Sequence, residues 1–381
     1  MVTEHHLIAT FDKLIQRLRY LLKLLGLDSY DPSYRPNIRT VIVLCLAALY
    51  MMISMYDLVH FSDDLFNFVY VLITFFFATI GIGRTTIYLS SGEALQFLLA
   101  ETYRTYREVR EDEREQRILC WYTNIYRWAV DTYARTFLVT SIIMGLGPLI
   151  NFLVTGEQVL PFGVVLPFVD SNSGLGYVLN YLYQLSCILW TGPGLMSSYC
   201  LTLALVANIC IQYDILAVKL ADLDEDILSH ADDLVARKLR DIIRDQQRVE
   251  RFVGMIEATY RMVSGVEVLS LGLQVIITLF VMQISFWMPG LFMIPLFSGQ
   301  LFIFCALGAA IQHKSESFAA GVYRLSWHEL PRREKQTFRI MLQRSQNSQK
   351  LTCSQISDIN LNLFVTMSQK FYSIFTMLRS F

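Results

Sequence analysis

Residues 268–313 of the chain read VLSLGLQVIITLFVMQISFWMPGLFMIPLFSGQLFIFCALGAAIQH. This stretch holds no Asp, Glu, Lys or Arg, and the nearest charged residues are Glu267 and Lys314. A helix of about 20 apolar residues is long enough to cross a lipid bilayer. The stretch therefore has room for two such helices joined by a tight turn. It predicts a membrane protein with transmembrane helices near Val266–Trp287 and Gly290–Gln312.

The rest of the chain has the same character. Apolar residues make up 54% of it, charged residues 17%, and the mean hydropathy is +0.41, values that are typical of a polytopic membrane protein. A second charge-free stretch lies between Asp170 and Asp214. We expect an all-α fold with seven transmembrane helices, forming one unit over residues 1–381. The predicted spans lie near Arg39–Tyr56, Phe66–Leu89, Tyr133–Val154, Gly176–Ile209, Val266–Trp287, Gly290–Gln312 and Ile356–Leu378.

The basic residues predict how these spans are oriented. The N-terminal tail and the loops after the second, fourth and sixth spans hold 5, 7, 8 and 8 Lys and Arg residues, with Arg84 near the end of the second span included. The loops near Asp57–Leu65, Thr155–Leu175 and Met288–Pro289 hold none. Short loops rich in Lys and Arg remain in the cytoplasm. We therefore expect the N-terminus in the cytoplasm and the C-terminus outside the cell.

The expected cytoplasmic segments show helical patterns of their own. In the tail of residues 1–37, apolar residues recur at three- and four-residue steps from Leu7 to Leu25, which predicts an amphipathic helix that stops at Gly26. Such a helix either lies on the inner leaflet or packs on the cytoplasmic ends of the spans. The fourth–fifth loop carries a near-heptad apolar stripe, which requires a helical partner. We expect a cytoplasmic helical bundle that anchors the spans. The stripe consists of Leu228, Val235, Leu239, Ile242, Val249, Phe252 and Ile256.

No residue pattern indicates an enzyme, a metal site or a cofactor. The six histidines lack H-x-x-x-H or H-E-x-x-H spacing, and the seven cysteines form no C-x-x-C pair. Gly81 and Gly83 lack the third glycine of a phosphate-binding loop. The net charge of −1 gives no reason to expect nucleic acid as a partner.

The last predicted span is unusually polar for a helix in lipid, since Asn, Ser, Thr, Gln and Lys residues alternate with its apolar ones. Polar residues in a span must face protein or water. Two interpretations stay open: the polar stripe bonds to neighbouring helices, or it lines a water-filled path. In the second case an apolar Met377 would gate the path by dewetting. The candidate pore and gate residues are Gln369, Ser373, Met377 and Ser380.

The outer halves of the second, third, fourth and sixth spans are apolar and aromatic, with few polar groups. A pocket of this composition suits a small uncharged molecule. Ordinary helix packing uses the same residue types, so both interpretations stay open here too. The candidate pocket residues are Phe66, Val69, Tyr70, Ile73, Ser141, Met144, Gly145, Pro148, Tyr177, Tyr181, Gln184, Phe292 and Phe297.

The C-terminal third carries several motifs in a fixed order. They are Ser315-Glu316-Ser317, Trp327-His328-Glu329-Leu330-Pro331, Met341-Leu342-Gln343-Arg344-Ser345-Gln346, Leu361-Asn362-Leu363-Phe364 and Tyr372-Ser373-Ile374-Phe375-Thr376-Met377-Leu378. Two Leu-Pro-Phe motifs, at Leu160 and Leu166, precede the fourth span. Together these motifs resemble the insect odorant receptor family.

The resemblance implies a subunit of an odorant-gated, non-selective cation channel. Such a subunit binds a small volatile in a transmembrane pocket and opens a pore lined by its last helix, where Met377 aligns with the gate. Family members form heteromeric tetramers with a shared co-receptor, in the plasma membrane of olfactory neuron dendrites. This chain lacks the long insertion of the co-receptor in the fourth–fifth loop and so resembles the variable, odorant-binding subunit.

Three other classes have the same general appearance. A gustatory-type ligand-gated channel shares the topology, but its last-span signature differs from the one around Tyr372 and Ser373. A G-protein-coupled receptor needs the opposite orientation of the basic loops and an N-P-x-x-Y turn, which the last span lacks. A secondary transporter would show two halves with matching broken helices, and no such pairing is visible in the sequence.

Overall fold

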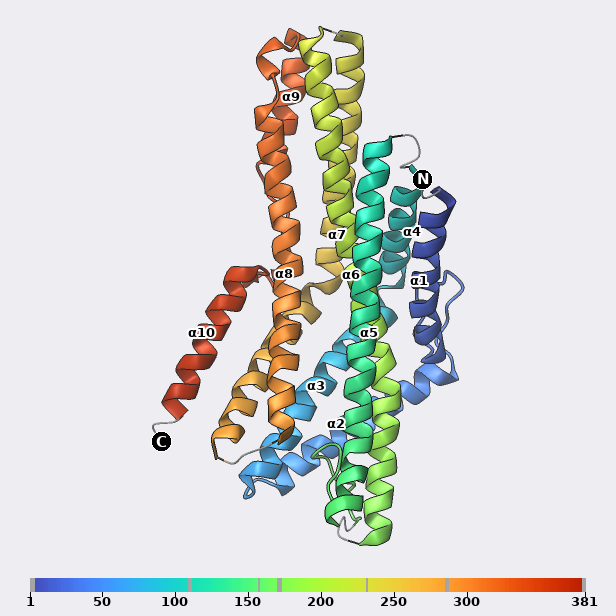
Figure 1. Ribbon diagram of the computed structural model, residues 1–381, viewed down its shortest axis with the longest axis vertical. Coiled ribbons are helices and arrows are strands. Elements are labelled where there is room, and N and C mark those ends of the chain that lie inside the picture. The colour runs from blue at the N-terminus through green and yellow to red at the C-terminus, as the bar shows by residue number, and fades with distance from the viewer. Residues whose placement is uncertain are drawn as a thin grey trace.

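The computed structural model describes residues 4–108, 112–156, 158–169, 173–230, 232–284 and 288–378. Over these ranges the chain is almost entirely helical, and α5 to α8 run along the long axis of the molecule (Figure 1). The all-helical fold class is confirmed, with one short β-hairpin as an addition. The helices are α1 (Glu4–Leu24), α2 (Ile38–His60), α3 (Leu65–Ser90), α4 (Gly92–Glu108), α5 (Glu113–Thr155), α6 (Gly174–Leu228), α7 (Asp232–Ile284), α8 (Met288–Arg324), the 3-10 turn η1 (Trp327–Glu329), α9 (Arg332–Ser345) and α10 (Leu361–Leu378); the antiparallel hairpin is β1 (Thr352–Cys353) with β2 (Ser357–Asp358).

Six helices in the described ranges are long and apolar enough to cross a membrane: α2, α3, α5, α6, α7 and α8. They contain the described residues of the first six predicted spans. Residues 285–287, at the end of the fifth span, lie outside the described ranges. α10 has 18 residues and is not one of the six, because the polar residues of its stripe lower its apolar character. The chain is thus a multi-pass membrane protein in which the seventh span stays a prediction.

The predicted start of the last span is wrong. Ile356 lies in the β-hairpin, and helix α10 begins only after it. Ser354 and Gln355 have φ angles of 51° and 61°, a left-handed conformation that no helix accommodates. Glu257 of α7 fixes the hairpin by accepting hydrogen bonds from the Thr352 backbone N–H (2.9 Å) and from its hydroxyl. The hairpin therefore attaches the start of α10 to α7.

The N-terminal amphipathic helix packs on protein. Phe11, Ile15, Leu18 and Leu22 of α1 are at most 2% exposed and belong to the same hydrophobic cluster as residues of α4, α5 and α6. The ring of Phe11 stacks on Tyr106 of α4, with centroids 4.3 Å apart. Of the two predicted placements, the structure therefore shows packing on the helix bundle. Gly26 ends the helix at φ +71°, as predicted, and a side chain there would collide with Asn37 and Thr40.

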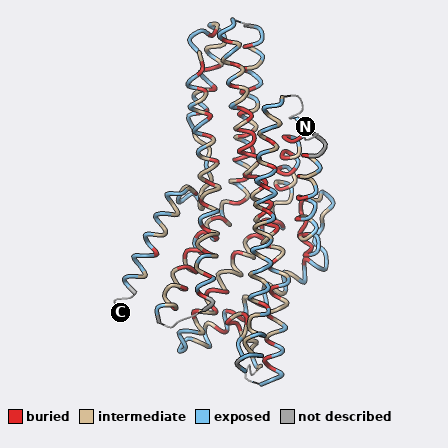
Figure 2. Tube along the Cα trace, viewed as in Figure 1, coloured by how far each residue is buried: buried red, intermediate tan, exposed pale blue. Residues whose placement is uncertain are grey.

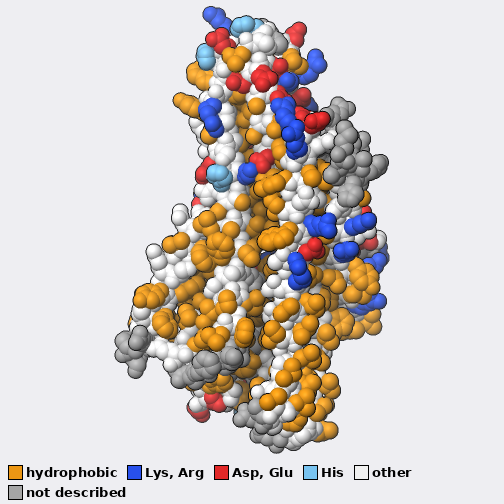
Figure 3. Space-filling model, viewed as in Figure 1, with side chains coloured by type: hydrophobic (Ala, Val, Ile, Leu, Met, Phe, Trp, Pro, Cys, Tyr) orange, Lys and Arg blue, Asp and Glu red, His pale blue; other side chains and the backbone are white. Residues whose placement is uncertain are grey.

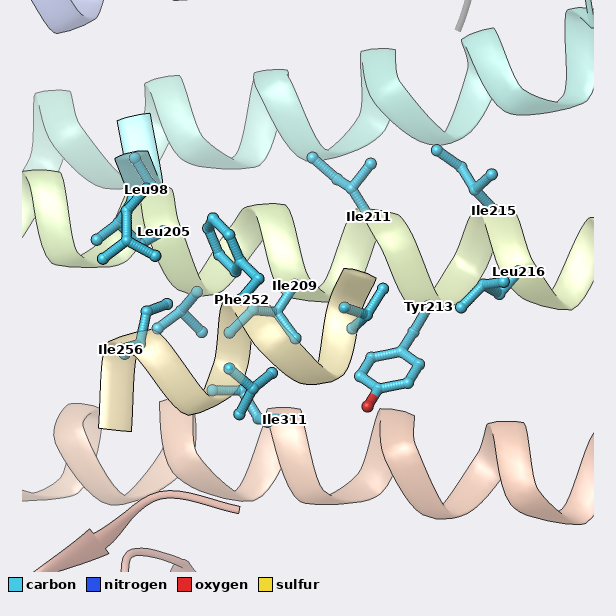
Figure 4. Packing of buried hydrophobic residues seen from close by; sticks show 14 of the residues in the cluster. Leu98, Leu205, Ile209, Ile211, Tyr213, Ile215, Leu216, Phe252, Ile256 and Ile311 are labelled. Atoms are coloured by element: carbon cyan, nitrogen blue, oxygen red, sulfur yellow. The ribbon is translucent and has the colours of Figure 1, made fainter. Parts of the chain in front are cut away.

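The predicted stripe of the fourth–fifth loop is buried in a helical bundle. Ile242, Val249, Phe252 and Ile256 of α7 are at most 1% exposed and meet α6 and α8 (Figure 4). The prediction fails at Leu228, which is 58% exposed because α6 ends there. α6 and α7 thus continue beyond the apolar segments and pack against each other, with α9 beside α7 and α8. We call this part of the molecule, residues 210–228 of α6, 232–265 of α7 and 313–345 of α8 to α9, the charged end.

A cluster of charged side chains joins α4 to α7. Arg248 of α7 forms ion pairs with Glu101 and Glu108 of α4. Partial burial raises the pKa of the Glu108 carboxyl, but the hydrogen bonds from Arg248 and Arg104 outweigh burial and hold the pKa below its usual value. The α3–α4 segment is thereby tied to the charged end.

α10 stands at the side of the molecule and is mostly exposed (Figures 1 and 2). Its buried side faces α7 and α8. Met367 and Phe371 approach Gly272 of α7, and Phe302 of α8 packs edge-on against Phe364 at 5.4 Å between ring centroids. The last helix therefore rests on the two helices that precede it.

We predict that Gly308→Ala weakens this attachment. A Cβ at Gly308 of α8 would collide with the Ile359 carbonyl oxygen, just before α10 begins. Backbone cannot yield as a flexible side chain does, so the free energy of unfolding should fall by about 1–3 kcal/mol. The measurement is the melting temperature of the detergent-solubilised protein. Gly299→Ala in the same helix is the control, because no atom lies within 4 Å of its added Cβ. Equal melting temperatures for the two variants would contradict the prediction.

Candidate ligand site and final helix

The end of the molecule opposite the charged end is covered by the α5–α6 loop, residues 158–169. Two fully buried side chains of α6 hold this loop. Gln184 accepts a hydrogen bond from the Phe162 backbone N–H at 2.7 Å and donates one to the Val164 carbonyl at 2.5 Å. Asn180 accepts from the Leu166 N–H at 2.7 Å. Because a buried backbone group must find a partner, these amides fix the loop over the helix ends.

The helices α2 and α3 bind the same loop from its other side. The Tyr70 hydroxyl donates to the Pro161 carbonyl at 2.6 Å, and Asp57 accepts from the Val165 N–H at 2.7 Å. Gly163 has no room for a side chain, since a Cβ there would lie 2.9 Å from the Tyr70 ring. The loop thus connects α2, α3 and α6 and acts as a lid.

The structure brings the predicted pocket residues together in two groups. In the first, Val69 and Ile73 of α3 meet Phe297 of α8 in one buried cluster, with Tyr70 and Met144 at its edge. All three central side chains are at most 5% exposed. This group comes from α3, α5 and α8, and the cluster around it includes residues of α7, such as Leu271.

The second group lies between α5 and α6. The Tyr181 hydroxyl donates to the Gly145 carbonyl, and the Tyr177 hydroxyl donates to the Val159 carbonyl at 3.2 Å. The two tyrosine rings lie 6.0 Å apart. Ser141 approaches Gly192, where an added Cβ would lie 3.5 Å from the serine oxygen.

Three predicted pocket residues have other surroundings. Phe66 and Phe292 are 40% and 60% exposed, so in the single chain they face outward. Pro148 is half-buried within α5. Sequence reasoning also missed a second role of three of these residues. The polar groups of Tyr70, Tyr177 and Gln184 form hydrogen bonds with the backbone of the lid. The two Leu-Pro-Phe motifs were the signal in the sequence that could have revealed this role, because the backbone groups of a buried loop need hydrogen-bond partners.

Sequence reasoning missed a buried ion pair between two of the membrane-crossing helices. Arg84 of α3 and Glu267 of α7 form an ion pair at 2.8 Å, with side chains 3% and 1% exposed. Arg84 also donates to Ser198 and Thr202 of α6 at 3.1 and 3.3 Å, and its guanidinium lies 3.7 Å from the ring centroid of Tyr199. One side chain thus holds three membrane-crossing helices together. A charge within an apolar span was the signal that could have revealed it.

A cavity of about 120 Å³ lies beside this ion pair, between α2, α3 and α6. None of the thirteen predicted pocket residues lines it. In the described part of the chain no group of three His, Cys, Asp or Glu residues is arranged to hold a metal ion.

α10 presents the predicted pore stripe on its exposed side. Gln369, Ser373 and Met377 are exposed at i,i+4 steps, with Met377 at 56%, whereas Phe371 is 7% exposed on the packed side. Ser380 lies outside the described residues. A single chain therefore leaves this stripe exposed on the side of α10 that faces away from α7 and α8.

Known odorant receptors are similar to this chain both in sequence and in fold. The sequence profile described as "7tm Odorant receptor" matches residues 64–372. Odorant receptor 10 of Aedes albopictus is 25% identical over 85% of this chain and 87% of its own length. Putative odorant receptor 83c of Drosophila melanogaster is 20% identical over 99% of both chains. The solved olfactory receptor OR5 of Machilis hrabei in complex with eugenol superposes with a TM-score of 0.80 over 98% of this chain and 99% of that one, at 14% identity.

We predict that removing one member of the Arg84–Glu267 pair destabilises the protein more than removing both members. Arg84→Met should lower the free energy of unfolding by about 3–5 kcal/mol, because it leaves the Glu267 carboxylate buried without a partner. The double variant Arg84→Met/Glu267→Met should recover much of that loss. The measurement is the melting temperature and monodisperse yield in detergent.

The control for that comparison is Arg104→Met. Arg104 pairs with Glu108 at 2.6 Å, but its side chain is 58% exposed, so its loss should cost under about 1 kcal/mol. If the double variant is no more stable than Arg84→Met alone, the ion pair is not what stabilises the contact between α3, α6 and α7.

Proposed function

Because the chain belongs to the 7tm odorant receptor family, we propose that it is the odorant-binding subunit of a ligand-gated, non-selective cation channel formed with the odorant co-receptor. Its place is in the plasma membrane, with the N-terminus in the cytoplasm and the C-terminus outside. The observation that carries the proposal is the match of the family profile along most of the chain. The similar fold and the exposed polar stripe on the last helix support it.

The charge distribution supports the proposed orientation. On the face in Figure 3, Lys and Arg side chains gather toward the charged end and beside α1, whereas the lower part is largely hydrophobic. In Figure 1 the first turn of α1 lies in the upper half of the molecule, and α10 runs into the lower half. Since basic segments stay in the cytoplasm, the charged end belongs inside the cell.

The proposed ligand is a small uncharged volatile. It would bind among α3, α5, α6 and α8, beneath the lid, where Val69, Ile73, Phe297, Met144 and Tyr181 supply apolar and aromatic surface with few polar groups. One of the solved structures that this fold matches is a complex with eugenol, a compound of this kind. Eugenol itself is a ligand of that receptor; for this chain it defines a class to test.

Ligand binding opens the channel only if the open arrangement binds the odorant more tightly than the closed one. The pocket residues of α8 lie on the same helix as Phe302, which packs on α10. α7 contributes to the same hydrophobic cluster and carries Gly272, against which Phe371 of α10 rests. A shift of α7 and α8 around the odorant would thus move the helix that carries the pore stripe.

We predict that cells expressing this chain together with the co-receptor show an inward cation current when a panel of small volatiles, eugenol included, is applied. Cells with either subunit alone are the controls. The chain carries an epitope after Phe381, and antibody binding to intact cells checks both surface delivery and the external C-terminus. No difference from the co-receptor alone across the panel, despite surface staining, would refute the proposal. Staining only after permeabilisation would refute the orientation.

We further predict that Met377→Asn raises the current recorded without odorant several-fold. An apolar ring at the narrow part of a pore excludes water, and an amide there would keep the path hydrated. Val365→Asn is the matched control, because Val365 is 50% exposed on the same helix but lies about 18 Å along the helix axis from Met377, away from the proposed gate. Unchanged resting current in Met377→Asn at equal surface expression would exclude Met377 from the gate.

A further inference from the structure

The cavity beside the ion pair is closed at both ends by separate parts of the chain. Phe162 of the lid covers it at one end, and Leu22 and Leu25 at the end of α1 cover it at the other. Its side walls come from α2, α3 and α6, chiefly Leu46, Tyr50, Phe77, Gly81, Trp190 and Leu195. The cavity therefore exists only because α2 packs on α3 while standing away from α6.

The polar groups of the wall fall into two kinds. The hydroxyls of Thr74, Thr85 and Thr191 donate to carbonyls of their own helices at 2.7–2.9 Å, so they are satisfied. The Arg84 Nε and the Tyr88 hydroxyl are buried and make no hydrogen bond within the described residues. A buried donor without a partner is costly. Neither atom has appreciable exposed surface, however, so the part of the wall that a ligand would touch is largely apolar.

The charge of Arg84 is already balanced. Both carboxylate oxygens of Glu267 accept from one guanidinium nitrogen, at 3.1 and 2.8 Å, and Ser198 accepts from the other. A ligand anion would add an uncompensated charge to a buried site. The wall therefore favours an uncharged and largely apolar molecule.

Size and position narrow the ligand further. An apolar cavity of roughly this volume takes a molecule of about the size of benzene. The three helices around it all qualify as membrane-crossing, so its side opening faces the hydrocarbon of the bilayer. Thr191 is exposed at this rim, and Leu46 and Gly81 are half-buried. The ligand would enter from the lipid.

We propose that this cavity is a second ligand site, which takes a small, uncharged and largely apolar molecule directly from the bilayer. It is separate from the proposed odorant pocket, whose predicted residues do not line it. Because the molecule would contact Arg84, it would touch the side chain that joins α3, α6 and α7. A volatile dissolved in the membrane would thus reach the helix crossing without passing the lid.

Photolabelling of the full chain in lipid nanodiscs tests this inference without any channel current. The probe is azibutanol, a short-chain alcohol that carries a diazirine. Adducts mapped by mass spectrometry should concentrate on lining residues such as Leu46, Phe77 and Trp190. An excess of unlabelled benzyl alcohol should displace them.

Gly81→Leu should reduce these adducts about tenfold or more, because the leucine side chain fills the space that the probe needs. No atom lies within 4 Å of a Cβ added at Gly81, so the change does not disturb the packing around the backbone. Gly299→Leu is the matched control at a glycine of α8 with equally open surroundings. Tyr88→Phe should leave labelling unchanged, because the Tyr88 hydroxyl has no accessible surface on the cavity.

Two results would overturn the inference. One is labelling of the lining residues that is equal in the wild type and in Gly81→Leu. The other is an adduct pattern spread over the lipid-facing residues of α2, such as Leu44 and Met52, with none in the cavity. Neither result would bear on odorant-evoked current with the co-receptor, so failure here leaves the proposed function standing.

Discussion

The arrangement of the membrane-crossing helices depends on the buried pair of Arg84 and Glu267. Taking two charges out of water costs several kcal/mol per ion, and only close pairing with further hydrogen bonds offsets that cost. Ser198, Thr202 and the ring of Tyr199 supply these additional contacts from α6. The positions of α3, α6 and α7 are therefore coupled, since none can shift without exposing a charge to lipid.

The same requirement explains the opposite end of the molecule. The lid enters a region where its backbone has little access to water, and Asp57, Tyr70, Asn180 and Gln184 provide the missing partners. These side chains come from three helices, so the lid and the ion pair hold α3 and α6 at two different depths. Between these two points lie Ile73 and the cavity toward α2, whereas the other predicted pocket residues of α3 and α6 lie at or beyond the lid contacts.

Features that follow from local pattern were predictable from the sequence. Apolar length gave the six membrane-crossing helices, and the near-heptad stripe through Ile242 and Phe252 gave the bundle at the charged end. Features that arise from pairs distant in sequence were not. Nothing local links Arg84 to Glu267, or Gln184 to the lid, and the hairpin before α10 rests on left-handed backbone at Ser354 and Gln355, residue types that carry no strong signal for it. The role of the last helix was predicted from the family motifs, because the hydropathy of this helix alone does not mark it as a membrane span.

The exposed side of α10 leads from the single chain to an assembly. A helix in a membrane does not keep Gln369 and Ser373 against lipid at no cost, because unsatisfied polar groups there are expensive. On its other side Phe364, Met367 and Phe371 already pack on α7 and α8, so the helix cannot rotate to bury the stripe. The polar side must then meet water or a partner helix. Several subunits that turned this side toward a common axis would satisfy both conditions, because they would enclose water between the stripes. This constraint is the physical argument for our proposal that the last helix lines the pore.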